Sequence, residues 1–225
     1  MKNLYKHISF SLLFFIPVCI PVHAQMKSCC EPDSVVLVST VKQTPGTLKM
    51  VKILDSISKH ANPVDFYVMN TARAELFKKQ IAIEKDPNKR VSLYFQYAVE
   101  SLNAGNTDEA ITVLKQIVAA LGLTTSDIPP GFKLLFDQLA IAYMRKGELE
   151  NCAANHNAQS CIIPMKGSGI HQLTSGSDSA IIIYKMILNK FPDDLQSRYL
   201  LNIAYMTLGR YPADVPKQWL IESDV

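Results

Sequence analysis

From residue 47 onward, apolar residues recur at intervals of three or four, which is the spacing that places them on one side of an α-helix. Residues 47–60 form the first such segment, with an apolar stripe of Leu48, Val51, Leu54 and Ile57. The dipeptide Asn62-Pro63 interrupts the pattern, which resumes over residues 64–84. The sequence therefore predicts two helices in this part of the chain.

A repeated pattern follows, in which helices alternate with short turns. Gly105, Gly147 and Gly209 each end an apolar-periodic segment, and glycine can close a helix in a left-handed conformation. Asp108, just after the first of these turns, places negative charge on the amides that open the next helix. The predicted helices span residues 91–104, 108–121, 132–146, 177–190 and 195–208.

The offsets around these turns resemble the tetratricopeptide repeat, a helix–turn–helix unit of about 34 residues. Ser101 and Gly122 depart from the repeat pattern, standing where a tyrosine and a proline would be expected. The resemblance covers residues 89–210 and implies an all-α array of stacked helix pairs, with residues 46–88 as a helical cap or a degenerate repeat. An irregular helical bundle is the alternative. The matching residues are Gly105, Ala110, Leu114, Tyr143, Gly147, Ala180, Tyr184, Pro192, Leu201, Tyr205 and Gly209.

A long insertion interrupts the array. Gly105 and Ala110 are five positions apart, whereas Gly147 and Ala180 are 33 apart, so the second loop holds 28 extra residues. A loop of this length inside a compact array is usually functional or disordered. Its cysteines, prolines and glycines favour a defined shape, and we assign the insertion to residues 149–176.

The insertion and the last helix also resemble the helical N-terminal region of large exported bacterial proteins. In that family a β-propeller of FG-GAP type and an ASPIC/UnbV-type module follow. The match covers residues 132–221, and it implies a protein or peptide partner, with a β-propeller domain as one candidate. The sequence departs from the family at Val225, where the propeller would begin, which leaves a stand-alone module or a truncated chain. The matching residues are Asn151, Cys152, His156, Asn157, Ser160, Cys161, Pro164, Gly167, Gly169, His171 and 200–212.

The first 24 residues have the features of a secretory signal. Lys2 and Lys6 precede an apolar run over residues 8–20, and Ala24 provides a small residue before a cut at Gln25. An uncleaved anchor is the alternative, although the run is too short to span a bilayer comfortably. We therefore expect an exported protein, periplasmic or extracellular, with residues 25–45 as a flexible lead-in and residues 211–225 as an extended tail.

Export favours disulfides over free thiols, and four cysteines remain after the leader. Cys152 and Cys161 bracket residues 155–157, and a bond between them would close a small loop that presents these polar side chains to a ligand. Cys29 and Cys30 lie in the lead-in, where pairing with each other, pairing elsewhere and idle thiols all remain open. The candidate binding residues are Asn155, His156, Asn157 and His171.

Two other interpretations use the same insertion. Cys152, His156, Cys161 and His171 are acceptable tetrahedral ligands for zinc or copper, although the spacing lacks a short Cys-x-x-Cys knuckle. A Cys–His catalytic pair would need an orienting third group, and the sequence supplies none. We therefore predict no enzymatic activity and no cofactor, with a bound metal as the alternative.

Charge narrows the classes of partner. The net charge is +3, and Lys2 and Lys6 account for two of these charges, so the chain without its leader carries +1. A net charge this small gives no strong positive potential that would attract nucleic acid or an anionic membrane. No second hydrophobic span follows the leader. The sequence predicts an exported helical-repeat scaffold for protein–protein or domain–domain interaction. A periplasmic metal-binding module is the alternative.

Overall fold

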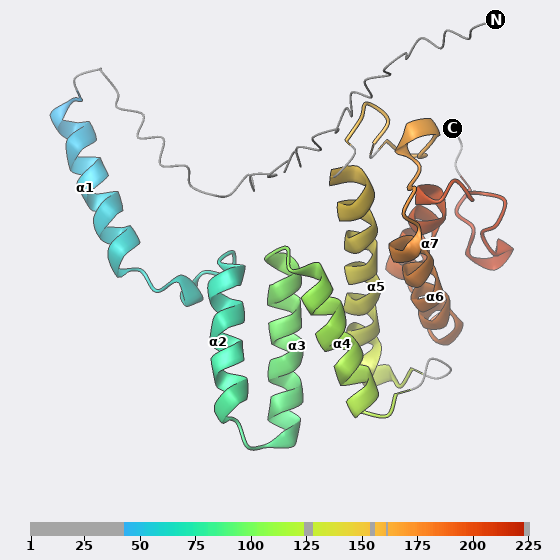
Figure 1. The fold of residues 1–225 in the computed structure, drawn as a ribbon, viewed down its shortest axis with the longest axis horizontal. Coiled ribbons are helices and arrows are strands. Elements are labelled where there is room, and N and C mark those ends of the chain that lie inside the picture. Colours follow the sequence, from blue (N-terminus) through green and yellow to red (C-terminus); the bar gives the residue numbers. More distant parts are fainter. Residues whose placement is uncertain (1–42, 124–127, 154–155, 161, 223–225) are drawn as a thin grey trace, which may run out of the picture. The chain divides into compact units, whose positions relative to one another are not determined.

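The computed structural model describes residues 43–123, 128–153, 156–160 and 162–222 (Figure 1). Every regular element in these ranges is a helix, so the described chain is all-α, as the sequence predicts. The leader (1–24) and nearly all of the lead-in (25–42) lie outside the described residues. The α-helices are α1 (Pro45–His60), α2 (Asn70–Ile83), α3 (Pro87–Asn103), α4 (Thr107–Ala120), α5 (Lys133–Glu148), α6 (Ser175–Lys190) and α7 (Leu195–Thr207).

The chain divides into two compact units, residues 1–57 and residues 58–225. The first contains most of α1, none of whose residues is buried. Positions three apart, such as Leu48, Val51, Leu54 and Ile57, rotate steadily around a helix of 3.6 residues per turn. The predicted stripe is therefore wrong in detail, because its four members cover half of the circumference. Met50, Ile53, Leu54 and Ile57 form the narrower apolar side of α1.

In the second unit, each helix packs mainly against its neighbours in sequence, from α2 through to α7 (Figure 1). The most extensive contact joins α5 and α6. One continuous core runs through α3 to α7, and short side chains such as Ala98, Ala110, Ala140 and Ala180 are fully buried in it. Larger core members include Leu114, Phe136, Tyr184, Ile187 and Leu201.

Three helices of this unit end at glycines with positive φ. The angles are 89° at Gly105, 62° at Gly122 and 66° at Gly209, which confirms the prediction for the first and the last. At each end, the amide after the glycine bonds to the carbonyl five positions earlier, as Asn106 does with Ser101. This pattern satisfies carbonyls that a helix terminus otherwise leaves unpaired.

Gly147 does not end its helix, and that prediction is wrong. Helix α5 continues through Glu148 into a π-helical turn, Leu149–Ala153. The glycine instead allows α6 to approach: a Cβ on Gly176 would lie 2.5 Å from the Gly147 backbone nitrogen. The absence of a side chain at these two positions lets the backbones of α5 and α6 meet closely, with Ser177 beside them.

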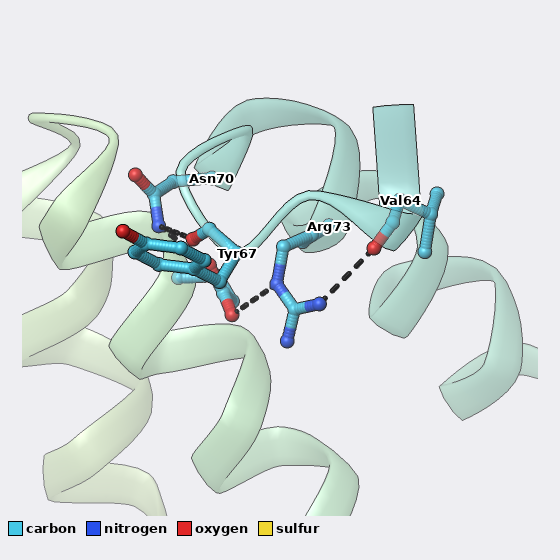
Figure 2. A network of polar contacts seen from close by, with 5 residues as sticks. Val64, Tyr67, Asn70 and Arg73 are labelled. Atoms are coloured by element: carbon cyan, nitrogen blue, oxygen red, sulfur yellow. Dashed lines mark hydrogen bonds and ion pairs between the residues drawn. The ribbon is translucent and has the colours of Figure 1, made fainter. Parts of the chain in front are cut away.

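The segment before α2 is also not a continuous helix, although its apolar pattern predicts one. It contains a 3-10 turn, Pro63–Asp65, and α2 begins only at Asn70. Figure 2 shows two hydrogen bonds in this segment: Arg73 donates to the Val64 carbonyl (3.1 Å), and the Asn70 side chain donates to the Tyr67 carbonyl (3.3 Å). Side chains thus take up carbonyls that helical amides would otherwise use.

A buried carboxylate on α3 holds both of these side chains. Glu100 accepts from Arg73 Nε at 2.6 Å and from Asn70 Nδ2 at 2.8 Å. Because a buried carboxylate is stable only when it is paired, this arrangement fixes the start of α2 against α3.

The segment after α7 returns onto that helix. Trp219 and Val215 are buried in the core, so the tail that the sequence predicts to be extended packs against the helices. The buried Asn202 side chain donates to the Trp219 carbonyl (2.8 Å) and accepts from the Ile221 amide (3.1 Å). Arg198 also donates to the Trp219 and Leu220 carbonyls. Residues 211–222 are therefore held by side chains of α7 and contain a 3-10 turn, Lys217–Trp219.

Candidate functional site

One asparagine closes the neck of the insertion. The Asn151 amide nitrogen donates to the carbonyls of Gly147 (2.8 Å) and Leu173 (2.9 Å). Its oxygen accepts from the backbone amides of Gln172 (2.7 Å) and Leu173 (2.8 Å). A single side chain therefore joins the first residues of the insertion to its last ones.

Within the insertion, two polar side chains hold residues 157–160 against residues 167–169. Ser168 donates from its amide and its hydroxyl to Gln159 Oε1, both at 2.8 Å. The side-chain Nδ2 of Asn157 donates to the Ser168 carbonyl at 3.1 Å. Gly169 permits the approach, because a Cβ there would lie 2.4 Å from the Gln159 carbonyl oxygen. The sequence Gly-Ser-Gly forms a 3-10 turn in this contact.

The insertion also docks on the end of α7. The His171 amide donates to the Thr207 carbonyl at 2.8 Å, which occupies an acceptor at the helix terminus. Beside it, Ile170 packs over Gly209, where a Cβ would lie 2.9 Å from the Ile170 Cδ1 atom. The insertion is thereby fixed to two helices, α5 through Asn151 and α7 through residues 170–171.

A chain of polar side chains is buried beneath the insertion. Cys152 Sγ lies 3.4 Å from His171 Nε2, and His171 Nδ1 lies 3.2 Å from Ser177 Oγ. The Thr207 hydroxyl lies 2.8 Å from Ser177 Oγ and also 2.8 Å from the Ala204 carbonyl. Burial lowers the pKa of His171 below its ordinary value of 6.5, with Glu148 opposing this, so the imidazole is neutral at pH 7.

An open groove of about 720 Å³ lies between the insertion and the segment that follows α7. Its lining combines apolar side chains with a nearly equal share of exposed polar surface, and its charged side chains are those of Lys166 and Glu222. The volume falls in the range of ligand-binding clefts, and methionines let such a surface adapt to different ligands. The lining residues are Pro164, Met165, Lys166, Gly167, Ile170, Met206, Gly209, Tyr211, Pro212, Leu220 and Glu222.

The chain matches no family model, no curated protein and no solved structure. The site is therefore interpreted from its own geometry. Within the part of the chain that the structure describes, no helix combines the length and the apolar character needed to cross a bilayer.

The structure separates the predicted binding residues. His156 is exposed, whereas His171 is buried against Cys152 and Ser177. Asn157 is half-buried and bonds within the loop, and Asn155 lies outside the described residues. Of the predicted set, His156 is thus the side chain that the structure places toward solvent, and ligand binding by any of them stays a prediction.

The disulfide and the metal site both depend on Cys161, which lies outside the described residues. The bond between Cys152 and Cys161 therefore stays a prediction. Two of the four predicted metal ligands, Cys152 and His171, lie side by side. Among the described residues, however, His, Cys, Asp and Glu side chains form no group of three that could hold a metal ion.

Sequence reasoning missed Asn151 as the closing residue, Ser177 and Thr207 as partners of the histidine, and the groove itself. In the sequence Asn151 stands out only as a motif residue, and an asparagine next to a loop gives no sign that it bridges 22 positions. Ser177 and Thr207 belong to different helices, 30 positions apart, and only the folded chain joins them.

Proposed function

We propose that this protein is an exported helical-repeat scaffold of the tetratricopeptide type that binds a protein or peptide. The observation that carries the proposal is the groove of about 720 Å³ between the insertion and the segment after α7. The packing of each helix on its neighbours in sequence, and the glycine turns at residues 105 and 209, support the repeat architecture. The leader supports export.

The chemistry of the groove fits an apolar peptide segment. Met165, Met206, Ile170 and Leu220 contribute flexible and branched apolar side chains from three parts of the chain. The insertion is fixed by hydrogen bonds at its neck and at α7, so a ligand need not order it on binding. Such preorganisation lowers the entropy lost on association. A disulfide between Cys152 and Cys161 would add to the same effect.

The test is selection of short random peptides on the immobilised protein, followed by affinity measurement for each selected peptide. Met165→Glu should weaken binding by about tenfold or more, because it places a charge in an apolar contact. Leu195→Glu is the matched control, since Leu195 is an exposed leucine of α7 that does not line the groove. Equal affinity of the wild type and Met165→Glu would contradict the proposal, as would the absence of any selected peptide.

A metal-binding module is the second candidate, favoured by the 3.4 Å contact between Cys152 and His171. Elemental analysis of protein purified under reducing conditions tests it. One zinc or copper ion per chain, lost in His156→Gln, would support the metal site over the disulfide. Peptide mapping without reduction that recovers Cys152 and Cys161 in one linked fragment would support the disulfide instead.

A further inference from the structure

One side of helix α1 is formed by exposed apolar side chains. At 3.6 residues per turn, Met50, Ile53, Leu54 and Ile57 fall on one side of the helix, and Val51 lies at its edge. The four side chains are between 43% and 57% exposed, and no residue of α1 is buried. An apolar helix side of this kind is stable only when an apolar environment covers it.

The other sides of α1 carry its charged residues, together with Leu48. Lys49, Lys52 and Lys59 lie away from the apolar side, and Asp55 is the sole acidic residue of the helix, which gives α1 a net charge of +2. Residues 61–225, which follow the helix, contain 16 basic and 17 acidic residues. Outside the leader, the excess of positive charge is therefore concentrated in α1. The near-neutral net charge of the whole chain does not describe the surroundings of this helix.

The apolar side of α1 and its positive charge together indicate which environment covers the helix. Pairing of α1 with a second copy of itself would bring two helices of charge +2 together, which like-charge repulsion opposes. A bilayer containing anionic lipid provides an apolar layer directly beneath negative phosphates, and so it complements both sides of α1 at once. With 16 residues, α1 is shorter than the roughly 20 apolar residues that a membrane span requires.

We propose that α1 binds the surface of an anionic lipid bilayer. The helix lies in the plane of the interface, with Met50, Ile53, Leu54 and Ile57 in the acyl–headgroup boundary and with Lys49 and Lys52 among the lipid phosphates. This attachment is separate from the groove near α7 and does not depend on the ligand of that groove. It would hold the scaffold at a membrane surface while the second unit remains in water.

The test is flotation of the purified, exported protein with lipid vesicles, after mass spectrometry has established its N-terminus. We expect binding to vesicles that contain phosphatidylglycerol and weak binding to pure phosphatidylcholine. Leu54→Glu should lower the partition coefficient by about tenfold or more, because burial of one leucine side chain is worth at least that factor. Lys49→Glu combined with Lys52→Glu should remove the preference for anionic lipid.

Leu195→Glu is the control, because it makes the same change at an exposed leucine outside α1. Leucine and glutamate have similar helix propensities, so circular dichroism should show an unchanged helix content in both variants. Any leader that remains is common to all variants and cancels in their comparison. Equal partitioning of Leu54→Glu and Leu195→Glu would overturn the proposal. A wild-type dimer that Leu54→Glu converts to a monomer would also overturn it, in favour of a second copy.

Discussion

Buried polar side chains in this protein join segments that are distant in sequence. Glu100 connects α3 to the start of α2, and Asn202 connects α7 to the segment that follows it. Ser177 lies between His171 of the insertion and Thr207 of α7. Because an unpaired buried polar group destabilises a fold, each of these residues makes the position of its partner segment specific.

His171 predicts a pH dependence of stability. Its pKa is lowered in the folded state, chiefly by burial, so below about pH 6.5 the unfolded chain binds a proton more readily than the native chain does. The contribution of His171 to the free energy of unfolding is therefore fully present above that pH, and it is lost as the pH falls. We expect the free energy of unfolding, measured with urea, to decrease between about pH 7 and about pH 5.

The variant His171→Gln should remove most of this slope, whatever it does to stability at pH 7. The matched control is His156→Gln, which removes an exposed imidazole from the same insertion. An unaltered slope in His171→Gln would show that another group causes the pH dependence.

The glycines show how far sequence reasoning reaches at this scale. Gly105, Gly147 and Gly209 follow similar apolar segments, and two of them adopt positive φ. Gly147 instead gives room to α6, because a Cβ there would lie 3.2 Å from Ser177 Oγ. Both roles require the absence of a side chain, so residue type alone does not distinguish them. His171 was likewise predicted as a ligand, because a loop without periodicity gives no signal of burial.

At the scale of elements, the most extensive contact in the second unit joins α5 and α6, and Gly147 and Gly176 meet in it. Figure 1 shows the two helices side by side in the second unit. The crossing explains why α5 continues past the expected turn, since the glycine backbone is used as a contact surface. It also places the π-helical turn, and with it Cys152, directly above His171.

Gly176→Ala should therefore destabilise the protein. The added methyl group would lie 2.5 Å from the Gly147 nitrogen and 2.8 Å from the Tyr143 carbonyl oxygen, and both are backbone atoms that cannot rotate away. We expect a loss of about 1–3 kcal/mol, the usual effect of overpacking, measured as a shift of the urea midpoint.

Gly131→Ala is the control, because a Cβ at that position meets nothing within 4 Å and its φ is not positive. Equal stability of Gly176→Ala and Gly131→Ala would mean that the two helices separate without penalty, which would contradict the crossing as described.

Helix positions were predictable wherever apolar periodicity was strong. The helix predicted over residues 195–208 is α7, Leu195–Thr207, and the one predicted over residues 108–121 is α4, Thr107–Ala120. The helix predicted from residue 64 begins only at Asn70. Its periodicity was real, but the side chains of Asn70 and Arg73 compete for its carbonyls, and that competition depends on Glu100, 30 and 27 positions away.

At the scale of the whole molecule, the boundary between the two compact units falls after Ile57, within α1. The second unit is closed at its C-terminal side by the segment after α7. Trp219 is the single tryptophan of the chain and is 5% exposed, so its fluorescence reports on this segment alone. The tail predicted as extended thus contributes an aromatic side chain to the core.

We expect this segment to unfold together with the helices of the second unit. The red shift of Trp219 fluorescence in urea should share its midpoint with the main loss of helical circular dichroism. Asn202→Ala should lower the free energy of unfolding by about 1–3 kcal/mol, because it leaves the Ile221 amide without its partner. Both midpoints should therefore move to a lower urea concentration. A fluorescence transition that precedes the loss of helix would show instead that the segment detaches independently.

The closure of the insertion by Asn151 has an evolutionary consequence. Its side-chain amide bonds to residues on both sides of the neck, so we expect the path of the backbone into α6 to be maintained by contacts outside the loop. Residues 153–169 can therefore change in length and composition while α5 and α6 keep their crossing. The neck also marks residues 153–169 as the position at which a foreign loop can be grafted onto this scaffold.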